Sequence, residues 1–129
     1  MFNRRYNNEL IINISRDIAK RKLSICDFDF TGDVPWETTE DRLEGLRLLS
    51  RMKPPFTINI SHLTFFPGSA LTERAIREGI VDKDQQPQGK DIFNIRNDFI
   101  NFLYVVYGVF HIPESALKHI INSSLVREM

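Results

Sequence analysis

The feature that most constrains the fold is a pattern that occurs twice, in which a strand-like run ends in a turn with proline and a helix follows at once. The pattern covers residues 29–41 and again residues 63–71. A hydroxyl residue stands where each helix would begin, Thr38 or Thr39 in the first copy and Ser69 in the second. Strand, turn and helix in repetition build a parallel sheet, whose ligand sites lie at the carboxyl ends of the strands. We therefore predict an α/β protein.

The first strand-like run, residues 23–33, alternates between two faces. We expect Phe28 and Phe30 to point outward into a layer of helices. The other face is polar and carries Asp27, Asp29, Thr31 and Asp33. A barrel interior that serves only stability is filled by branched apolar residues, so these carboxylates favour a wet interior that holds a ligand. An edge strand with Asp27 and Asp29 in solvent is the alternative explanation.

The second strand-like run, residues 56–65, places Asn59 and Ser61 on the side opposite to its two isoleucines. By the same reasoning, these two polar side chains face the interior. The turn that follows, residues 66–69, offers free backbone amides at a helix start, an arrangement that suits an anion. A tight turn between strand and helix is the simpler explanation of those four residues.

Apolar residues at helical spacing predict two helices in the first half of the chain. Asn7 or Asn8 caps the first, and Pro54 ends the second. The predicted buried stripe of the first helix is Leu10, Ile11, Ile14 and Ile18, and that of the second is Leu43, Leu46, Leu49 and Met52.

Three helices are expected after the second strand. A short one covers residues 70–78 and ends at Gly79. A polar loop, residues 81–90, separates it from a long helix that begins at Asp91, and Pro113 opens the last helix. The predicted buried stripe of the long helix is Ile92, Ile95, Phe99, Phe102, Leu103, Val106 and Phe110.

Composition and charge narrow the classes of function. The 129 residues are 42% apolar, which is enough for one folded core. Seventeen basic residues balance seventeen acidic ones, so nothing suggests a nucleic acid or an anionic membrane surface as partner. Cys26 is the only cysteine, which excludes an internal disulfide and favours a reducing, cytoplasmic setting. The most apolar segment, residues 99–112, is shorter than the ~20 residues that span a bilayer.

Residues 33–41, residues 63–69 and the pair Gly79-Ile80 resemble the later part of the radical S-adenosylmethionine (radical SAM) domain, especially its cobalamin-associated branch. The resemblance covers nearly the whole chain. It implies a partial (half) parallel β/α barrel of about two strands with flanking helices, formed by residues 1–81. Residues 82–129 would form a helical pair packed on it. The chain then corresponds to the carboxyl-terminal half of a catalytic domain.

The resemblance also implies which residues lie near SAM. The candidate cofactor-binding residues are Asp33, Pro35, Glu37, Asn59, Ser61 and Leu63. In the family, the turn that corresponds to residues 33–38 shapes the adenosine side of the site, and the strand before Pro67 borders the adenine. That turn usually carries a glycine where this chain has Asp33. Glu37 is explained equally as an acid favoured by the dipole of a helix start.

Radical SAM enzymes bind a four-iron cluster through a Cys-x-x-x-Cys-x-x-Cys loop, which this chain lacks. SAM and the cluster are therefore implied by the resemblance alone, and cobalamin is the third cofactor that this branch suggests. The three histidines, His62, His111 and His119, have no spacing that builds a metal site. We predict no catalytic residue and no metal ligand in this chain.

Two hypotheses about function follow from different classes. In the first, the chain is a fragment of a radical SAM enzyme that contributes part of the SAM and substrate side and is not catalytically competent alone. Its partner would be a missing amino-terminal half, a separate polypeptide, or another copy that associates through the open sheet edge. In the second, the chain is a non-catalytic α/β interaction module that binds a partner through that edge.

Overall fold

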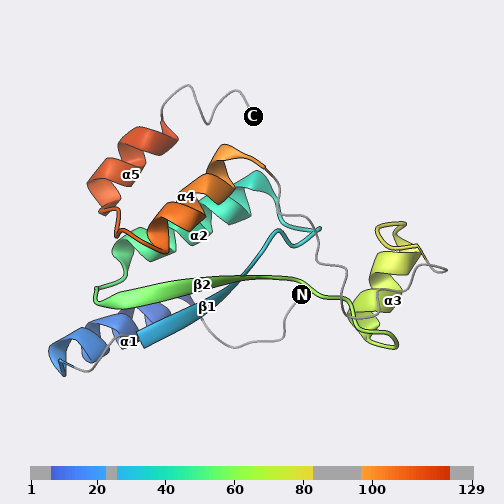
Figure 1. Cartoon of the computed structure of the whole chain (residues 1–129), viewed down its shortest axis with the longest axis horizontal. Helices are drawn as coiled ribbons and strands as arrows, with labels where there is room; N and C mark the ends of the chain where they lie inside the picture. Colours follow the sequence, from blue (N-terminus) through green and yellow to red (C-terminus); the bar gives the residue numbers. More distant parts are fainter. Residues whose placement is uncertain (1–6, 23–25, 83–96, 123–129) are drawn as a thin grey trace.

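The computed structural model describes residues 7–22, 26–82 and 97–122. These residues form an α/β fold, as predicted (Figure 1). The elements in chain order are α1 (Asn8–Lys20), β1 (Cys26–Gly32), α2 (Thr39–Arg51), β2 (Phe56–His62), α3 (Ala70–Arg77), α4 (Phe99–Tyr107) and α5 (Glu114–Ile121). The loop predicted over residues 81–90 lies largely outside the described residues.

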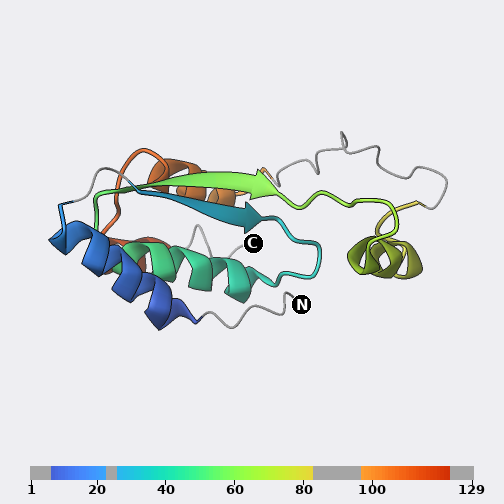
Figure 2. The same cartoon turned by 90° about the horizontal axis from the view of Figure 1, so that it is seen from below.

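The strands β1 and β2 pair in parallel, from Cys26 opposite Phe56 to Gly32 opposite His62. The helix α2 connects them, so the predicted strand, helix and strand unit is confirmed. Figures 1 and 2 show α2, α4 and α5 gathered beside this two-stranded sheet. Parallel strands require such a crossover, because the carboxyl end of the first strand and the amino end of the second lie at opposite ends of the sheet.

The two faces of β1 differ as the alternation predicts, because its side chains are alternately half-buried and exposed. Phe28 and Phe30 pack against the helix layer. Asp27, Asp29 and Thr31 are exposed on the other face. The sheet therefore has one face that is covered by helices and one polar face, which we call the open face.

The main core lies between the sheet and the helices. Its α2 residues include the predicted stripe of Leu43, Leu46, Leu49 and Met52. Thr38 caps this helix through a capping box, in which its side chain accepts from the Asp41 amide and the Asp41 carboxylate accepts from the Thr38 amide. The local signals for α2 thus agree with its packing.

The stripe predicted for α1 is wrong in part. Leu10 and Ile14 are each 43% exposed, whereas Ile12 and Ser15 are buried. The reason is a polar contact, since Ser15 Oγ accepts a hydrogen bond of 2.9 Å from the backbone amide of Lys53. This bond turns the Ile12 side of α1 toward the segment that follows α2.

The long helix predicted from Asp91 is also wrong in part, although Asp91, Ile92 and Ile95 lie outside the described residues. Asp98 caps α4 by accepting from the Asn101 amide at 2.9 Å, so the helix begins at Phe99. Its buried residues are Ile100, Leu103 and Tyr107. Two residues of the predicted stripe, Phe102 and Phe110, are exposed.

A second apolar cluster lies past the carboxyl ends of the strands. Its buried members are Val34, Leu63, Phe65 and Ala75 of α3. Ser69 caps α3 and Gly79 ends it with a φ of +71°, as predicted. The predicted strand over residues 56–65 is shorter, because Leu63 and Phe65 leave the sheet to join this cluster. No helix in the described ranges is long and apolar enough to cross a membrane.

Gly45 of α2 leaves the space that the Tyr104 side chain of α4 occupies, and replacing the glycine tests this packing. In Gly45→Ala the new methyl group would meet the Tyr104 hydroxyl and lie 3.2 Å from the ring carbon Cζ. We expect a loss of about 1–3 kcal/mol of stability in urea unfolding, because the site has no room for the methyl group. In a Tyr104→Phe background the same substitution should cost less. An equal cost in both backgrounds would contradict this role of Gly45.

Candidate functional site

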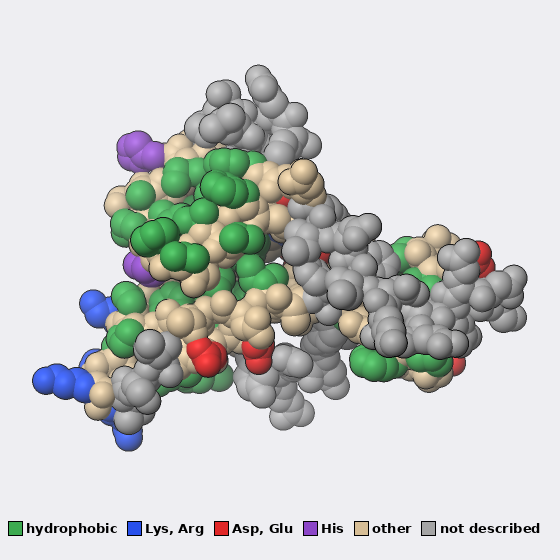
Figure 3. Space-filling view, in the orientation of Figure 1, with side chains coloured by type: hydrophobic (Ala, Val, Ile, Leu, Met, Phe, Trp, Pro, Cys, Tyr) green, Lys and Arg blue, Asp and Glu red, His purple; other side chains and the backbone are tan. Residues whose placement is uncertain are grey.

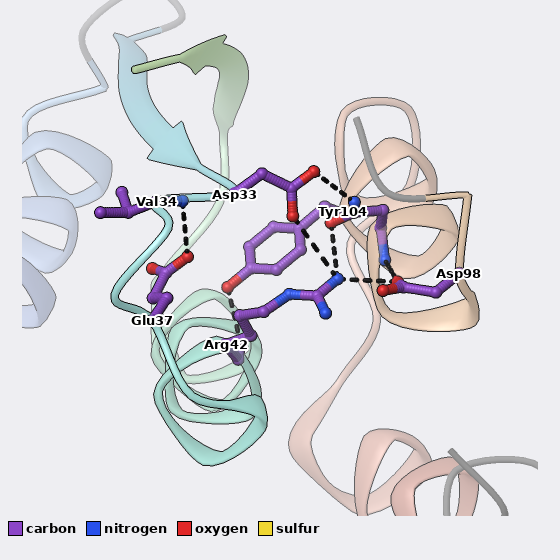
Figure 4. A network of polar contacts seen from close by, with 7 residues as sticks. Asp33, Val34, Glu37, Arg42, Asp98 and Tyr104 are labelled. Carbon is purple, nitrogen blue, oxygen red and sulfur yellow. Dashed lines mark hydrogen bonds and ion pairs between the residues drawn. The ribbon is translucent and has the colours of Figure 1, made fainter. Parts of the chain in front are cut away.

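Three segments meet beside the carboxyl ends of the strands: the turn after β1, the first half of α2 and the start of α4 (Figure 4). Together with the helix side of the sheet they surround a pocket of about 260 Å³. Its charged and amide groups come from Asp33, Glu37, Asp41, Arg42 and Asn101. Open parallel sheets bind ligands outside the carboxyl ends of their strands, and this pocket lies beside those ends.

Arg42 is the centre of a buried network that joins these segments, and its side chain is 5% exposed. Its Nη2 donates to Asp98 Oδ1 at 2.7 Å and to Asn101 Oδ1 at 2.9 Å, and it lies 3.9 Å from Asp33 Oδ1. Asn101 Nδ2 donates in turn to Asp33 Oδ2 at 2.8 Å. A buried arginine is costly unless it is paired and hydrogen-bonded. These contacts therefore hold the start of α4 against α2 and the turn after β1.

Asp33 lies on the helix side of the sheet, which corrects the prediction that it shares a face with Asp27 and Asp29. Its φ is +52°, so the strand alternation stops there. Its buried carboxylate points toward Asn101 and Arg42 (Figure 4). Glycine adopts this left-handed conformation freely and aspartate tolerates it. A glycine at position 33 would therefore adopt the same backbone conformation without strain.

Glu37 closes the turn after β1. Its amide donates to Val34 O at 2.9 Å, and its Oε2 accepts from Val34 N at 3.2 Å. Burial raises the pKa of Glu37, while the bond from Val34 and the charge of Arg42 offset part of that rise. Among the described residues, no lysine or arginine forms an ion pair with Glu37. Glu37 is therefore a poorly solvated acid at the edge of the pocket.

Tyr104 forms a wall of the pocket. Its hydroxyl donates to the backbone oxygen of Arg42 at 2.7 Å, across the space that Gly45 leaves open. Burial raises the pKa of Tyr104, so the hydroxyl stays protonated and keeps this bond at neutral pH. The tyrosine thus fixes α4 to α2 at a second point, close to the Arg42 network.

The other predicted site residues lie in three places. Asn59 and Ser61 are on the open face, where Asn59 Nδ2 donates to Asp29 Oδ1 at 3.0 Å. Ser61 Oγ donates to the Phe30 backbone oxygen at 3.3 Å. Pro35 lies in the turn after β1, and Leu63 is buried in the α3 cluster. The six residues therefore do not surround one cavity within the described chain.

The sequence did not predict four polar residues that line the pocket, which are Asp41, Arg42, Asn101 and Tyr104. Asn101 gave a signal, because it interrupts the most apolar segment of the chain and a polar residue there needs a partner. Arg42 gave none, since an arginine on a helix is usually solvated. Its partner Asp98 lies 56 residues away in the sequence.

The residues present do not fit a four-iron cluster. Cys26 is the only cysteine in the sequence, and such clusters are held by several thiolates. Within the described ranges, no group of three or more His, Cys, Asp or Glu side chains could hold a metal ion. Comparison with known proteins found no matching family model, no matching curated protein and no matching solved structure.

Removing the central charge of the network should destabilise the fold strongly. Arg42→Ala removes the buried cation that bonds to Asp98 and faces the buried carboxylate of Asp33, so we expect a loss of roughly 3 kcal/mol or more in urea unfolding. Arg42→Lys keeps the charge and should lose less. Hydrogen exchange at the α4 amides should accelerate in Arg42→Ala. A loss below about 1 kcal/mol, well under the usual cost of breaking a buried pair, would contradict the network's role.

The raised pKa of Glu37 predicts how the stability of the fold changes with pH. Because burial raises this pKa, the folded state favours the protonated acid, and that stabilisation is present below the unfolded pKa of about 4.3 and lost as pH rises through the folded pKa. Glu37→Gln does not titrate there, so its stability relative to the native chain should rise from pH 4 to pH 7.

The control for this trend is Asp41→Asn. Hydrogen bonds from Thr38 lower the pKa of Asp41, so Asp41 contributes stability above its unfolded pKa that is lost as pH falls. Because the pKa of Asp41 lies below the unfolded value of about 3.9, most of this change occurs in acid, and the relative stability of Asp41→Asn should fall as pH rises from about 2.5 to 5, opposite in sign to the trend of Glu37→Gln. Urea unfolding over these two pH ranges measures both trends. The same sign in the two variants would show that burial of Glu37 does not decide its titration.

Proposed function

We propose that this chain is part of the wall of a parallel β/α barrel and contributes the SAM and substrate side of a radical SAM enzyme that another polypeptide or a second copy completes. The observation that supports this is the two-sided sheet. Helices cover the face with Phe28 and Phe30, while the face with Asp29 and Asn59 is polar and exposed. In a β/α barrel the helices lie outside and the uncovered face lines the interior.

Two parallel strands alone cannot enclose a ligand, and a sheet this small leaves unpaired backbone groups at its edges. Further strands beside β1 or β2 would extend the open face into a cavity. The single cysteine of this sequence cannot hold a four-iron cluster, so the thiolates would come from the completing polypeptide. The cluster and SAM, when bound, supply the radical chemistry.

On this proposal the residues of this chain bind and orient the nucleoside part of SAM. Asn59 and Ser61 offer amide and hydroxyl groups on the open face, and the turn with Pro35 and Glu37 adjoins its carboxyl end. The amide of Asn59 and the hydroxyl of Ser61 can each donate and accept hydrogen bonds, as the edge of an adenine requires. This assignment rests on the resemblance together with the exposure of these side chains.

A second candidate function, a non-catalytic interaction module, is favoured by one observation. Hydrophobic side chains gather over α4 and α5 on the face seen in Figure 3. The exposed hydrophobic residues of α4 and the segment after it include Phe102, Val105, Val109 and Phe110. Val109 is 71% exposed and Phe110 is 69% exposed. Apolar patches of this kind mark surfaces that bind other proteins.

Nucleoside binding tests the first candidate. We expect adenosine and S-adenosylhomocysteine to shift the amide resonances of residues 29–37 and 59–63 in heteronuclear NMR. The dissociation constant should be millimolar, a binding free energy of about −4 kcal/mol, because on this proposal the chain holds only part of the site. Methionine should cause no such shifts, since the residues assigned to SAM are those on its adenosine side. Ser61→Ala should weaken adenosine binding. Thr57→Ala, at the amino end of the same face, should not.

Two results would overturn the proposal. One is the absence of shifts with adenosine at several millimolar, the concentration range that such weak binding requires. The other is a set of shifts confined to the α4 and α5 surface, which would instead support the interaction module. Equal effects of Ser61→Ala and Thr57→Ala would show that the carboxyl end of the open face has no special role.

A further inference from the structure

The pocket on the helix side of the sheet is separate from the open face. Its apolar walls include Phe30 and Ile60 of the sheet and Tyr104 and Val105 of α4. Its volume of about 260 Å³ is just below the range of roughly 300–1,000 Å³ that is usual for ligand pockets. It therefore suits a small molecule with a compact apolar body.

The acidic side chains around this pocket differ in how fully they are paired with cations or hydrogen-bond donors. Arg42 bonds to Asp98 and lies 3.9 Å from Asp33, and its charge acts on Glu37 without forming an ion pair with it. The carboxylate of Asp41 accepts from the amide and the hydroxyl of Thr38. Glu37 accepts only the Val34 amide among the described hydrogen bonds, and it has no ion pair with a described lysine or arginine.

An ammonium group is the chemical partner that such an acid lacks. Burial raises the pKa of Glu37, which means that its carboxylate is poorly solvated where it stands. A poorly solvated carboxylate gains more from a nearby cation than an exposed one does, because solvent screens the pair less. The remaining wall of the pocket offers aromatic and branched aliphatic surface to the rest of the ligand.

We propose that this pocket binds a small primary amine, whose ammonium group pairs with Glu37 and whose aromatic or branched aliphatic body lies between Phe30, Ile60 and Tyr104. The site lies on the other side of the sheet from Asn59 and Ser61. It shares Glu37 with the residues assigned to SAM but does not rest on that assignment, because benzylamine binding and adenosine binding are measured separately.

Benzylamine and benzyl alcohol test this proposal, because they share a ring and a shape but differ in charge. We expect benzylamine to bind the native chain at pH 7.5 at least roughly tenfold more tightly than benzyl alcohol, since hydrogen bonds to charged groups are the stronger ones. Heteronuclear NMR titration measures both affinities. Benzylamine should shift the amides of Gly32, Glu37 and Val105, and not those of Asn59 and Ser61.

Two variants test which carboxylate pairs with the ammonium group of benzylamine. Glu37→Gln keeps an acceptor for the Val34 amide and should reduce benzylamine binding to the level of benzyl alcohol. Asp41→Asn removes a second acid of the same pocket and should leave benzylamine binding within about twofold of the native value, because exposed pairs contribute little. The comparison of benzylamine with benzyl alcohol on the native chain tests the preference for an amine even if a variant folds poorly. Equal affinity for the two probes, no binding of benzylamine, or an unchanged affinity in Glu37→Gln would each overturn the proposal.

Discussion

The bond between Arg42 and Asp98 is the interaction on which the arrangement of the helices depends. It joins α2 to the residue that caps α4, and Asn101 extends the same contact to Asp33 in the turn after β1. Because all these groups are partly or fully buried, each would be costly without the others. The network therefore fixes both the position and the rotation of α4, and it leaves Leu103 inside and Phe102 outside.

The sheet has a different role on each of its faces. On the helix side, Phe30 and Ile60 contribute to the pocket. On the open face, one strand residue away, Asp29 pairs with Asn59 across the strands. A parallel sheet is normally covered on both faces. The open face of this sheet departs from that rule, and the proposed barrel rests on this departure.

The sequence was sufficient for those elements whose signals are local. The capping box of Thr38 and the stripe of Leu43 and Leu46 belong to the same helix, and the parallel pairing follows from the strand, helix and strand order. The rotation of α4 depends instead on Arg42, which is 56 residues from Asp98, and the docking of α1 depends on a bond to a backbone amide. Neither of these two contacts produces a periodic pattern in the sequence, so the buried faces of α1 and α4 were predicted incorrectly in part.

Asp33 shows how one backbone angle can move a charge between the two faces. With extended backbone its carboxylate would join Asp27 and Asp29 on the open face, where water solvates it. The φ of +52° sends it to the helix side, where it is buried and would be destabilising without a cation. Arg42 and Asn101 supply that compensation. A glycine in the same turn would need neither partner, so the aspartate at 33 and the arginine at 42 are best understood as one interdependent feature of this chain.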